Sequence, residues 1–242
     1  MNGKFAIALI VLVWITLGDA RSPKAGEHLF ILSGQSNMTG GLQSGFSKGV
    51  QAHFGEENVT VVFHCKSGRG IRFWDKDYAF PQDYRIPGKG EPSERSRLQH
   101  GQEYKPLIEG TLAACKGNSF DTVTLIWMQG ESDGARNLGE VYEQSFLRLL
   151  ERMKKDLARD DLNFVLGRIS DARLSDDSDP GWRRVRQVQV KIAEEAPWGE
   201  WINTDDLNGP NDDLHYPGEF QSQLGSRFAD QAIDLIRRRE AN

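Results

Sequence analysis

Apolar, β-branched runs alternate with amphipathic stretches along most of the chain. Five runs predict β-strands: EHLFILSG (27–34), VTVVFHC (59–65), DTVTLIWM (121–128), NFVLGRIS (163–170) and EWINT (200–204). The first four are almost continuously apolar, as expected for strands that are covered on both faces. Four amphipathic stretches predict helices, at 104–115, 139–158, 182–196 and 218–239. Strands that alternate with helices, with few hairpin signals, predict an α/β fold with a parallel sheet between helical layers.

One segment interrupts this alternation. Residues 75–102 are rich in Asp, Lys, Arg, Pro and Gly, and they also carry the aromatic residues Tyr78, Phe80 and Tyr84. A connection this long inside a domain is often functional. Two interpretations stay open: the segment shapes a substrate cleft, or it is a surface excursion that is packed by its own aromatic side chains.

The chain has 242 residues, without an internal repeat or a low-complexity linker. Residues 1–20 resemble a secretory signal, with Lys4 followed by the apolar run 5–17 and a small-residue exit at Ala20. We therefore expect a signal peptide at 1–20, a single domain at 21–242, and a secreted or periplasmic protein without a stable membrane partner. The alternative is an uncleaved membrane anchor.

The formal net charge is -5, and both signs are interspersed. A mildly acidic chain without a basic block argues against nucleic acid as a partner. The two cysteines, Cys65 and Cys115, form a disulfide in an exported protein or remain as buried thiols; the sequence leaves both open. Neither cysteine lies in a Cys-His metal pattern, so we expect no metal and no cofactor.

Polar clusters follow four of the predicted strands: SGQSNM, KSGRGI, QGESD and NDDLHY. In an open parallel sheet, ligands bind beyond the carboxyl ends of the strands. These clusters are far apart in the sequence, and the topology is expected to bring them together at one edge of the sheet.

Ser36, in the first cluster, is a candidate nucleophile if a base lies beside it. Of the five histidines, His215 is the best placed base, because it follows the last predicted strand and precedes the last helix. Asp212 lies three residues earlier, a spacing that allows its carboxylate to orient the imidazole. Asp213 ranks second. The alternative is that NDDLHY is only the N-terminal cap of the last helix.

Acyl transfer also requires hydrogen-bond donors for the oxyanion that develops in the transition state. Three candidates lie in the same clusters: the backbone N–H groups of Ser36 and Gly68, and the side-chain amide of Gln129. Each is a weak signal alone, because glycine turns and polar residues after strands are common. Their joint placement is what favours an oxyanion hole.

The motifs GQSNM, SGRGI, WMQGESD and DDLHY resemble the four sequence blocks of the SGNH hydrolase superfamily. The resemblance is closest to the branch of sialate O-acetylesterase-like proteins and family 6 carbohydrate esterases. It implies a flavodoxin-like, three-layer α/β/α sandwich with a five-stranded parallel sheet. It also implies a serine esterase that removes O-acetyl groups from carbohydrates such as acetylxylan or sialate-type substrates. Ser36, His215 and Asp212 become its triad, and Ser36, Gly68 and Gln129 its oxyanion hole.

Further residues have supporting roles in this resemblance. Glu131 matches the second acidic position of the branch, and either supports His215 or braces its loop. Gln35 and Asn37 flank the nucleophile. The second block departs from the usual GGTSI and reads SGRGI. This departure leaves three residues, Arg69, Arg72 and Trp74, as candidate substrate contacts or as structural side chains.

Two rival functions remain. One is a carbohydrate-binding protein that keeps the scaffold without turnover, and the other is a lipid or thioester hydrolase of the same superfamily. The complete set of catalytic candidates argues against the first, and the polar, aromatic 75–102 segment argues against the second.

Overall fold

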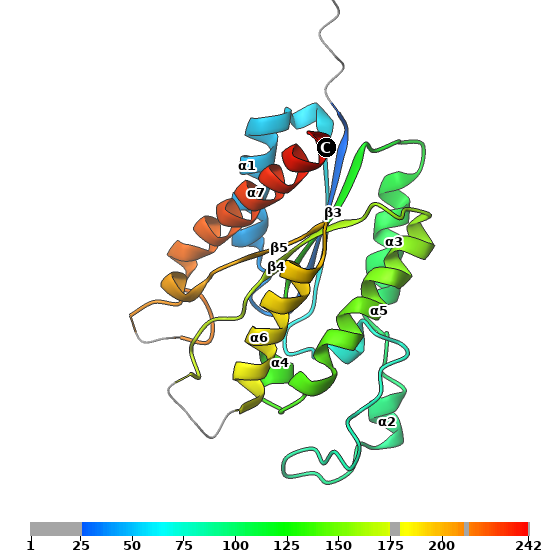
Figure 1. The fold of residues 1–242 in the computed structure, drawn as a ribbon, viewed down its shortest axis with the longest axis vertical. Helices are drawn as coiled ribbons and strands as arrows, with labels where there is room; N and C mark the ends of the chain where they lie inside the picture. The colour runs from blue at the N-terminus through cyan, green and yellow to red at the C-terminus, as the bar shows by residue number, and fades with distance from the viewer. Residues whose placement is uncertain (1–25, 175–179, 211–212, 242) are drawn as a thin grey trace, which may run out of the picture.

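All five predicted strands form one parallel sheet, in the order β2-β1-β3-β4-β5 (Figure 1). In a computed structural model, which describes residues 26–174, 180–210 and 213–241, the strands are β1 (His28–Gly34), β2 (Val59–Cys65), β3 (Thr122–Met128), β4 (Asn163–Gly167) and β5 (Gly199–Ile202). Almost every residue of β1, β3 and β4 is buried. The continuous apolar runs in the sequence therefore correspond to strands that are covered on both faces.

Helices cover both faces of this sheet. Within the described residues they are α1 (Gly40–Phe54), α2 (Glu94–Arg97), α3 (Tyr104–Cys115), α4 (Glu131–Gly134), α5 (Gly139–Leu157), α6 (Pro180–Glu195) and α7 (Gly218–Glu240). One core joins α1 and α7 to the face of β1 that carries Phe30 and Leu32. The other core joins α3, α5 and α6 to the face that carries Leu29 and Ile31. The predicted three-layer α/β/α sandwich is confirmed.

Helix α1 was not predicted. Its sequence, GGLQSGFSKGVQAHF, contains four glycines, which lower helix propensity in isolation. The contact between α1 and α7 explains one of these glycines, Gly45, and one glycine of α7, Gly225. A Cβ atom built on Gly45 would lie 2.1 Å from the carbonyl oxygen of Ser222, and one on Gly225 of α7 would lie 2.1 Å from that of Leu42. The backbones of α1 and α7 therefore approach each other more closely than side chains would allow.

Two predicted strands end earlier than their apolar runs. β4 stops at Gly167 and not at Ser170, because the chain turns toward α6, where the Ile169 N–H donates to the Gln189 side chain. β5 stops at Ile202. The following Thr204 hydroxyl donates instead to the Arg168 carbonyl. The residues that follow β4 and β5 thus leave the sheet at its carboxyl edge.

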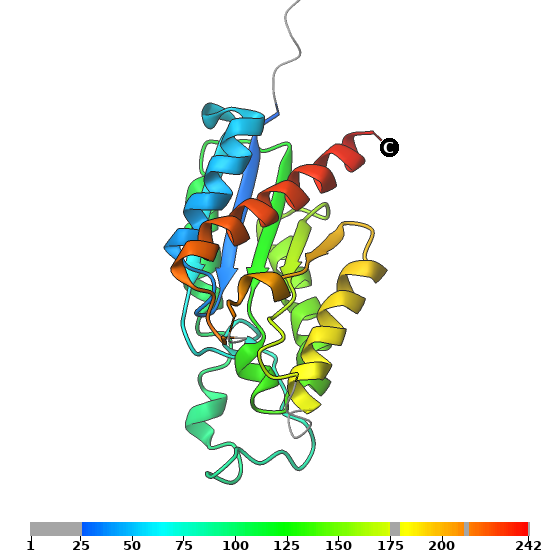
Figure 2. The same cartoon turned by 90° about the vertical axis from the view of Figure 1, so that its left-hand side faces the viewer.

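The carboxyl ends of the central strands lie level with one another. Gly34 pairs with Cys65 of β2 on one side and with Met128 of β3 on the other. Figure 2 shows these strands ending on the side of the molecule where α4 and the long segment around α2 lie. Residues that follow β1, β2 and β3 therefore start from the same edge of the sheet.

Cys65 and Cys115 are both free thiols, and burial raises the pKa of each. The disulfide alternative is thereby excluded in this structure. Among the described residues, no helix is long and apolar enough to cross a membrane. The predicted signal segment, residues 1–20, lies outside the described residues.

Candidate active site

Ser36 lies in a sharp turn that directly follows β1. Gly34 has φ +153°, and a Cβ atom there would lie 1.9 Å from the Met128 carbonyl oxygen, so only glycine fits. The next residue, Gln35, donates its backbone N–H to that same oxygen at 2.9 Å. This turn carries Ser36 off the end of the sheet and leaves it half-buried at the sheet edge.

His215 lies beside Ser36. Its Nε2 atom is 3.0 Å from the Ser36 hydroxyl oxygen, although the two residues are 179 positions apart in the sequence. Both line a cleft of about 620 Å³. The side chain of His215 is exposed. A hydroxyl within hydrogen-bond distance of an imidazole, open to solvent on one side, is the geometry that general-base activation requires.

Asn37 connects this turn to the loop that carries His215. Its amide nitrogen donates to the Leu214 carbonyl at 3.1 Å, and its amide oxygen accepts the Tyr216 N–H at 3.4 Å. The two residues that flank His215 are thus fixed by one side chain. Asn37, predicted as a supporting residue, thus clamps the backbone on both sides of the imidazole.

The acidic partner of His215 has two candidates, Asp212 and Glu131. Asp212 lies outside the described residues. Asp213, which ranked second to Asp212, is exposed. Glu131 lines the cleft and is 3% exposed. Its Oε1 atom accepts from Asn37 at 2.6 Å, while its Oε2 atom is buried without a hydrogen-bond partner among the described residues. Burial raises the pKa of Glu131 to about 7.

Gly68 lines the same cleft, in the turn after β2. Its φ of +70° favours glycine, although a Cβ atom there would meet nothing within 4 Å. The start of this turn is tied to β1, because the Lys66 N–H donates to the Gly34 carbonyl at 3.0 Å. The structure thus brings together Ser36, His215 and Gly68 around one cleft.

Gln129, the predicted side-chain donor of the oxyanion hole, is not among the residues that line the cleft. The side chain is fully buried. Its amide nitrogen lies 2.6 Å from Asp133 Oδ2, 3.2 Å from Gln35 Oε1 and 3.2 Å from the Arg69 carbonyl. These three acceptors follow β3, β1 and β2, so Gln129 joins the three turns beneath the site.

Asp133 forms part of the same buried network. Its Oδ2 atom also accepts the Ile71 N–H at 2.8 Å. Burial raises its pKa to about 6, against the opposing effect of the Gln129 hydrogen bond. Two carboxyl groups, Glu131 and Asp133, are therefore buried in the same short helix, α4, and Glu131 lines the cleft.

The three residues that the sequence offered as substrate contacts or as structural side chains contact other parts of the protein. Trp74 is fully buried and packs edge-on against Trp127, with ring centroids 5.2 Å apart. Arg72 stacks over the Phe73 ring and donates to the Ser96 carbonyl at 2.7 Å. Arg69 stacks over the same ring and pairs with Glu103. None of the three lines the cleft.

The long segment both packs on its own aromatic side chains and lines the cleft. Its base packs on its own aromatic rings: Phe80 stacks on Tyr84 with centroids 5.4 Å apart, and Tyr78 is buried. Its tip, closed by a bridge between Ile86 and Gly90, contributes Ile86, Pro87 and Lys89 to the cleft wall.

Sequence reasoning missed the cations of the cleft. Lys89, Arg136 and Arg173 line it, and Glu131 is the one acidic residue among the described residues that do so. Lys89 and Arg136 form no ion pair within the described part of the chain. Arg136 follows the QGESD motif by three positions, which was the available signal. Lys89 had none, because its place depends on how the long segment folds.

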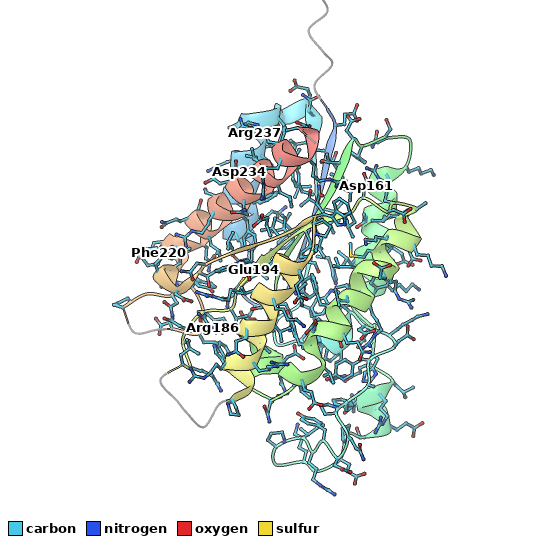
Figure 3. All side chains as sticks on the ribbon, in the orientation of Figure 1. Asp161, Arg186, Glu194, Phe220, Asp234 and Arg237 are labelled. Atoms are coloured by element: carbon cyan, nitrogen blue, oxygen red, sulfur yellow. The ribbon has the colours of Figure 1, made fainter. Side chains whose placement is uncertain are left out.

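A second hollow, of about 420 Å³, lies over α6 and shares no lining residue with the Ser36 cleft. Arg186 and Glu194, which are labelled in Figure 3, both line it. Arg186 forms an ion pair with Asp205, with 2.8 Å between Nη1 and Oδ1. Across the described residues, no group of three or more His, Cys, Asp or Glu side chains is arranged to hold a metal ion.

Comparison with known proteins identifies the family. The family model described as carbohydrate esterase, sialic acid-specific acetylesterase, matches residues 41–234. A comparison with curated proteins finds no match. Among solved structures, a protein from Arabidopsis thaliana is 17% identical, with a TM-score of 0.62, covering 86% of this chain and 98% of its own.

A carbohydrate acetylesterase from Xanthomonas citri is 15% identical, with a TM-score of 0.61; the match covers 87% of this chain and 56% of the other. NanS is 15% identical with a TM-score of 0.51, covering 75% and 66%. The chain thus spans just over half of the Xanthomonas protein and about two thirds of NanS, and at these identities the likeness concerns the fold. From the family match, the chain belongs to the carbohydrate esterase family of sialic acid-specific acetylesterases and is a carboxylic ester hydrolase.

Proposed function

We propose that the protein removes O-acetyl groups from carbohydrates, with Ser36 as nucleophile and His215 as general base. The observation that carries this proposal is the 3.0 Å contact between Ser36 Oγ and His215 Nε2 inside a 620 Å³ cleft at the carboxyl edge of the sheet. The family match begins at residue 41, so the role of Ser36 depends on this geometry.

In the first half of the reaction, Ser36 Oγ attacks the carbonyl carbon of the acetyl group while His215 Nε2 accepts its proton. The carbonyl oxygen becomes an oxyanion, which accepts hydrogen bonds from the backbone N–H groups of Ser36 and Gly68. The bond between the acyl carbon and the sugar oxygen then breaks. His215 returns the proton to that oxygen, and an acetyl-Ser36 ester remains.

In the second half, a water molecule takes the place of the sugar hydroxyl. His215 accepts a proton from the water, whose oxygen attacks the acetyl-Ser36 carbonyl. Collapse of this second intermediate breaks the ester bond, protonates Ser36 Oγ and releases acetate. The exposed position of His215 gives water direct access for this step.

For the imidazolium that forms in both halves, we propose stabilisation by Asp212 or Glu131. Asp212 has the spacing of a triad acid, three residues before His215. Glu131 has an Oε2 atom without a partner among the described residues, in the cleft wall. Separate Asp212→Asn and Glu131→Gln variants distinguish them, because the true partner lowers kcat by a far larger factor than the other residue.

The charge of the cleft favours a sugar that carries a carboxylate, of the sialate type, over neutral acetylxylan. Lys89, Arg136 and Arg173 line the same space as Ser36, and the one acid among the described lining residues, Glu131, is buried. Guanidinium groups bind carboxylates through paired, charge-assisted hydrogen bonds.

Export remains part of the proposal and depends on the signal-like residues 1–20.

Acetate release from acetylated sialic acid, acetylated xylan and an aryl acetate tests the function. Ser36→Ala and His215→Ala are each expected to lower kcat by at least about 10³-fold. Ser226→Ala, on the exposed face of α7, is the matched control and retains full activity. Wild-type turnover by both active-site variants would contradict the proposal. Sugar binding without acetate release would favour a binding protein, and preference for long-chain acyl esters a lipid hydrolase.

A further inference from the structure

The Gly68 N–H group lies in a weakly supported part of the turn after β2. The turn starts where the Lys66 N–H donates to the Gly34 carbonyl. Ser67 and Gly68, which follow, are both exposed, and within the described part of the chain neither forms a hydrogen bond. Glycine also has the widest choice of backbone conformation. The direction of the Gly68 N–H group therefore depends on how the residues on either side of it are held.

Arg69, directly after Gly68, is held through both its backbone and its side chain. Its carbonyl oxygen accepts from the Gln129 side chain at 3.2 Å. Its guanidinium group lies over the Phe73 ring, 4.3 Å from the ring centroid. Its buried Nε atom is 3.6 Å from Glu103 Oε1. The second end of the turn is thus anchored by an ion pair and a ring as well as by a hydrogen bond.

Glu103 is a fixed partner for this guanidinium group. It lies directly before α3, is only 8% exposed, and donates its backbone N–H to the Phe73 carbonyl at 2.7 Å. Its Oε2 atom is 3.2 Å from Nε2 of His64, on β2. Burying a carboxylate is costly unless it is paired, and Arg69 is the cation that reaches it from the turn. The ion pair therefore ties the turn after β2 to the start of α3.

We propose that the ion pair between Arg69 and Glu103 positions the Gly68 N–H group for the oxyanion, which makes both side chains positioning residues of the esterase. This inference rests on the proposed function of Ser36, with Gly68 as a donor. Neither Arg69 nor Glu103 lines the cleft, so they act by limiting the conformations that are open to the turn. An oxyanion donor is most effective when its direction is fixed before the reaction, since it then need not reorient.

Release of acetate from a neutral aryl acetate tests this role. Arg69→Met keeps an unbranched side chain and removes the guanidinium group, while Glu103→Gln keeps the shape and removes the charge. Each is expected to lower kcat by about three- to thirtyfold, less than the loss of about 10²- to 10³-fold on removing a donor, with KM within about twofold of the wild type. The double variant should lose no more than the weaker of the two, because the pair acts as one unit.

The signs of the two effects separate positioning from a change in the charge near the cleft. Arg69→Met removes a positive charge and Glu103→Gln a negative one, so a direct electrostatic effect on the oxyanion would change kcat in opposite directions. Positioning lowers kcat in both. Arg152→Met, on α5, is the matched control and should keep wild-type kcat, because Arg152 also lies over a ring, Tyr104, and pairs with a carboxylate, Asp77, at 2.9 Å.

A second readout concerns the oxyanion itself. An aryl thionoacetate carries sulfur in place of the carbonyl oxygen and accepts hydrogen bonds weakly. The wild type and Arg152→Met should therefore prefer the oxygen ester strongly, and Arg69→Met and Glu103→Gln should lose at least about threefold of that preference. General damage to the site lowers both rates together and leaves their ratio unchanged.

The inference is overturned if folded Arg69→Met or Glu103→Gln keeps kcat within threefold of the wild type, if the double variant loses the product of the two single losses, or if the oxygen-to-sulfur ratio equals that of the wild type. Melting temperatures establish folding, and the isosteric Glu103→Gln decides alone if Arg69→Met does not fold. Ser36→Ala is assayed in parallel. If it is inactive while the other variants keep wild-type kcat, only the inference fails; if it is active as well, the proposed function fails.

Discussion

At the scale of single residues, two side chains hold the segments around Ser36 in place. Gln129 joins the turns that follow three strands. Asn37 fixes the backbone on both sides of His215 and also donates to Glu131. The contact between Ser36 and His215 joins segments that are distant in sequence, so it depends on these intermediate side chains.

Replacing Asn37 by Ala should therefore reduce both activity and stability. The substitution frees the His215 loop and leaves Glu131 and the Leu214 carbonyl without their donor. We expect kcat to fall at least about tenfold, and the free energy of unfolding to fall by about 1–3 kcal/mol, the range for an unsatisfied buried group. Kinetics and urea denaturation measure the two effects.

Asn58→Ala provides the comparison. Asn58 also donates to a backbone carbonyl, that of Phe54 at 2.7 Å, but it lies before β2, at the opposite edge of the sheet. This variant should lose stability without losing kcat. An Asn37→Ala protein with wild-type kcat would show that the clamp is dispensable.

Glu131 should make stability depend on pH. Burial raises its folded pKa from 4.5 to about 7, so between these values the folded state binds more protons than the unfolded state. The free energy of unfolding therefore decreases as pH rises through this interval, by about 3 kcal/mol for this group. Asp133, with its pKa raised to about 6, contributes in the same direction.

Glu131→Gln removes the titration and keeps an oxygen for Asn37. Its free energy of unfolding should decrease less between pH 5 and pH 8 than that of the wild type, and the variant should be the more stable protein at pH 8. Urea denaturation at the two pH values is the measurement. Equal pH dependence in both proteins would exclude a protonated Glu131 in the folded state.

At the scale of elements, the close packing of α1 on α7 constrains the fold. Gly45 and Gly225 each lie where a Cβ atom would be 2.1 Å from a carbonyl oxygen of the other helix. Helix α1 begins at Gly40, shortly after Ser36 in the chain, so its position also limits how the turn at Ser36 is oriented.

Gly45→Ala should destabilise the protein by about 1–3 kcal/mol, since overpacking forces the two backbones apart. Gly40→Ala is the matched control: it lies in the first turn of the same helix, a Cβ atom there meets nothing within 4 Å, and alanine favours the helix by about 0.5–1 kcal/mol. Urea denaturation of both variants compares them. A Gly45→Ala protein as stable as Gly40→Ala would contradict the close approach.

At the scale of the whole molecule, the cleft and the chain carry opposite charge. The net charge is -5, while the described residues that line the cleft include three Lys or Arg side chains and one buried acid. A positive cleft on an acidic protein attracts anionic substrates, while the rest of the surface repels them, and salt screens both effects.

Lys89→Glu should therefore lower kcat/KM for an acetylated acidic sugar by about three- to tenfold, and leave a neutral aryl acetate within about twofold. The difference should shrink at high salt. Lys116→Glu, at the end of α3 on the opposite edge of the sheet, makes the same charge change as a control. Equal effects of Lys89→Glu on acidic and neutral esters would exclude charge selection by the cleft.

The strands, four of the helices and the pairing of Ser36 with His215 could be predicted, because each leaves a local signal: apolar periodicity, or a polar cluster after a strand. α1 could not, since its glycines make sense only against α7. Gln129 and Trp74 were assigned to the site because they follow strands or motifs there, but the sequence does not state the direction of a side chain. The cations of the cleft depend on the path of residues 75–102.

Covalent labelling tests the central claim most directly. A fluorophosphonate reacts with an activated serine, which displaces fluoride and leaves a stable phosphonate ester on the oxygen. Peptide mass mapping of the labelled protein should place the adduct on Ser36, acetate release should fall in proportion to labelling, and His215→Ala should label far more slowly. An adduct on a different residue, or acetate release that persists after Ser36 is fully labelled, would contradict the account.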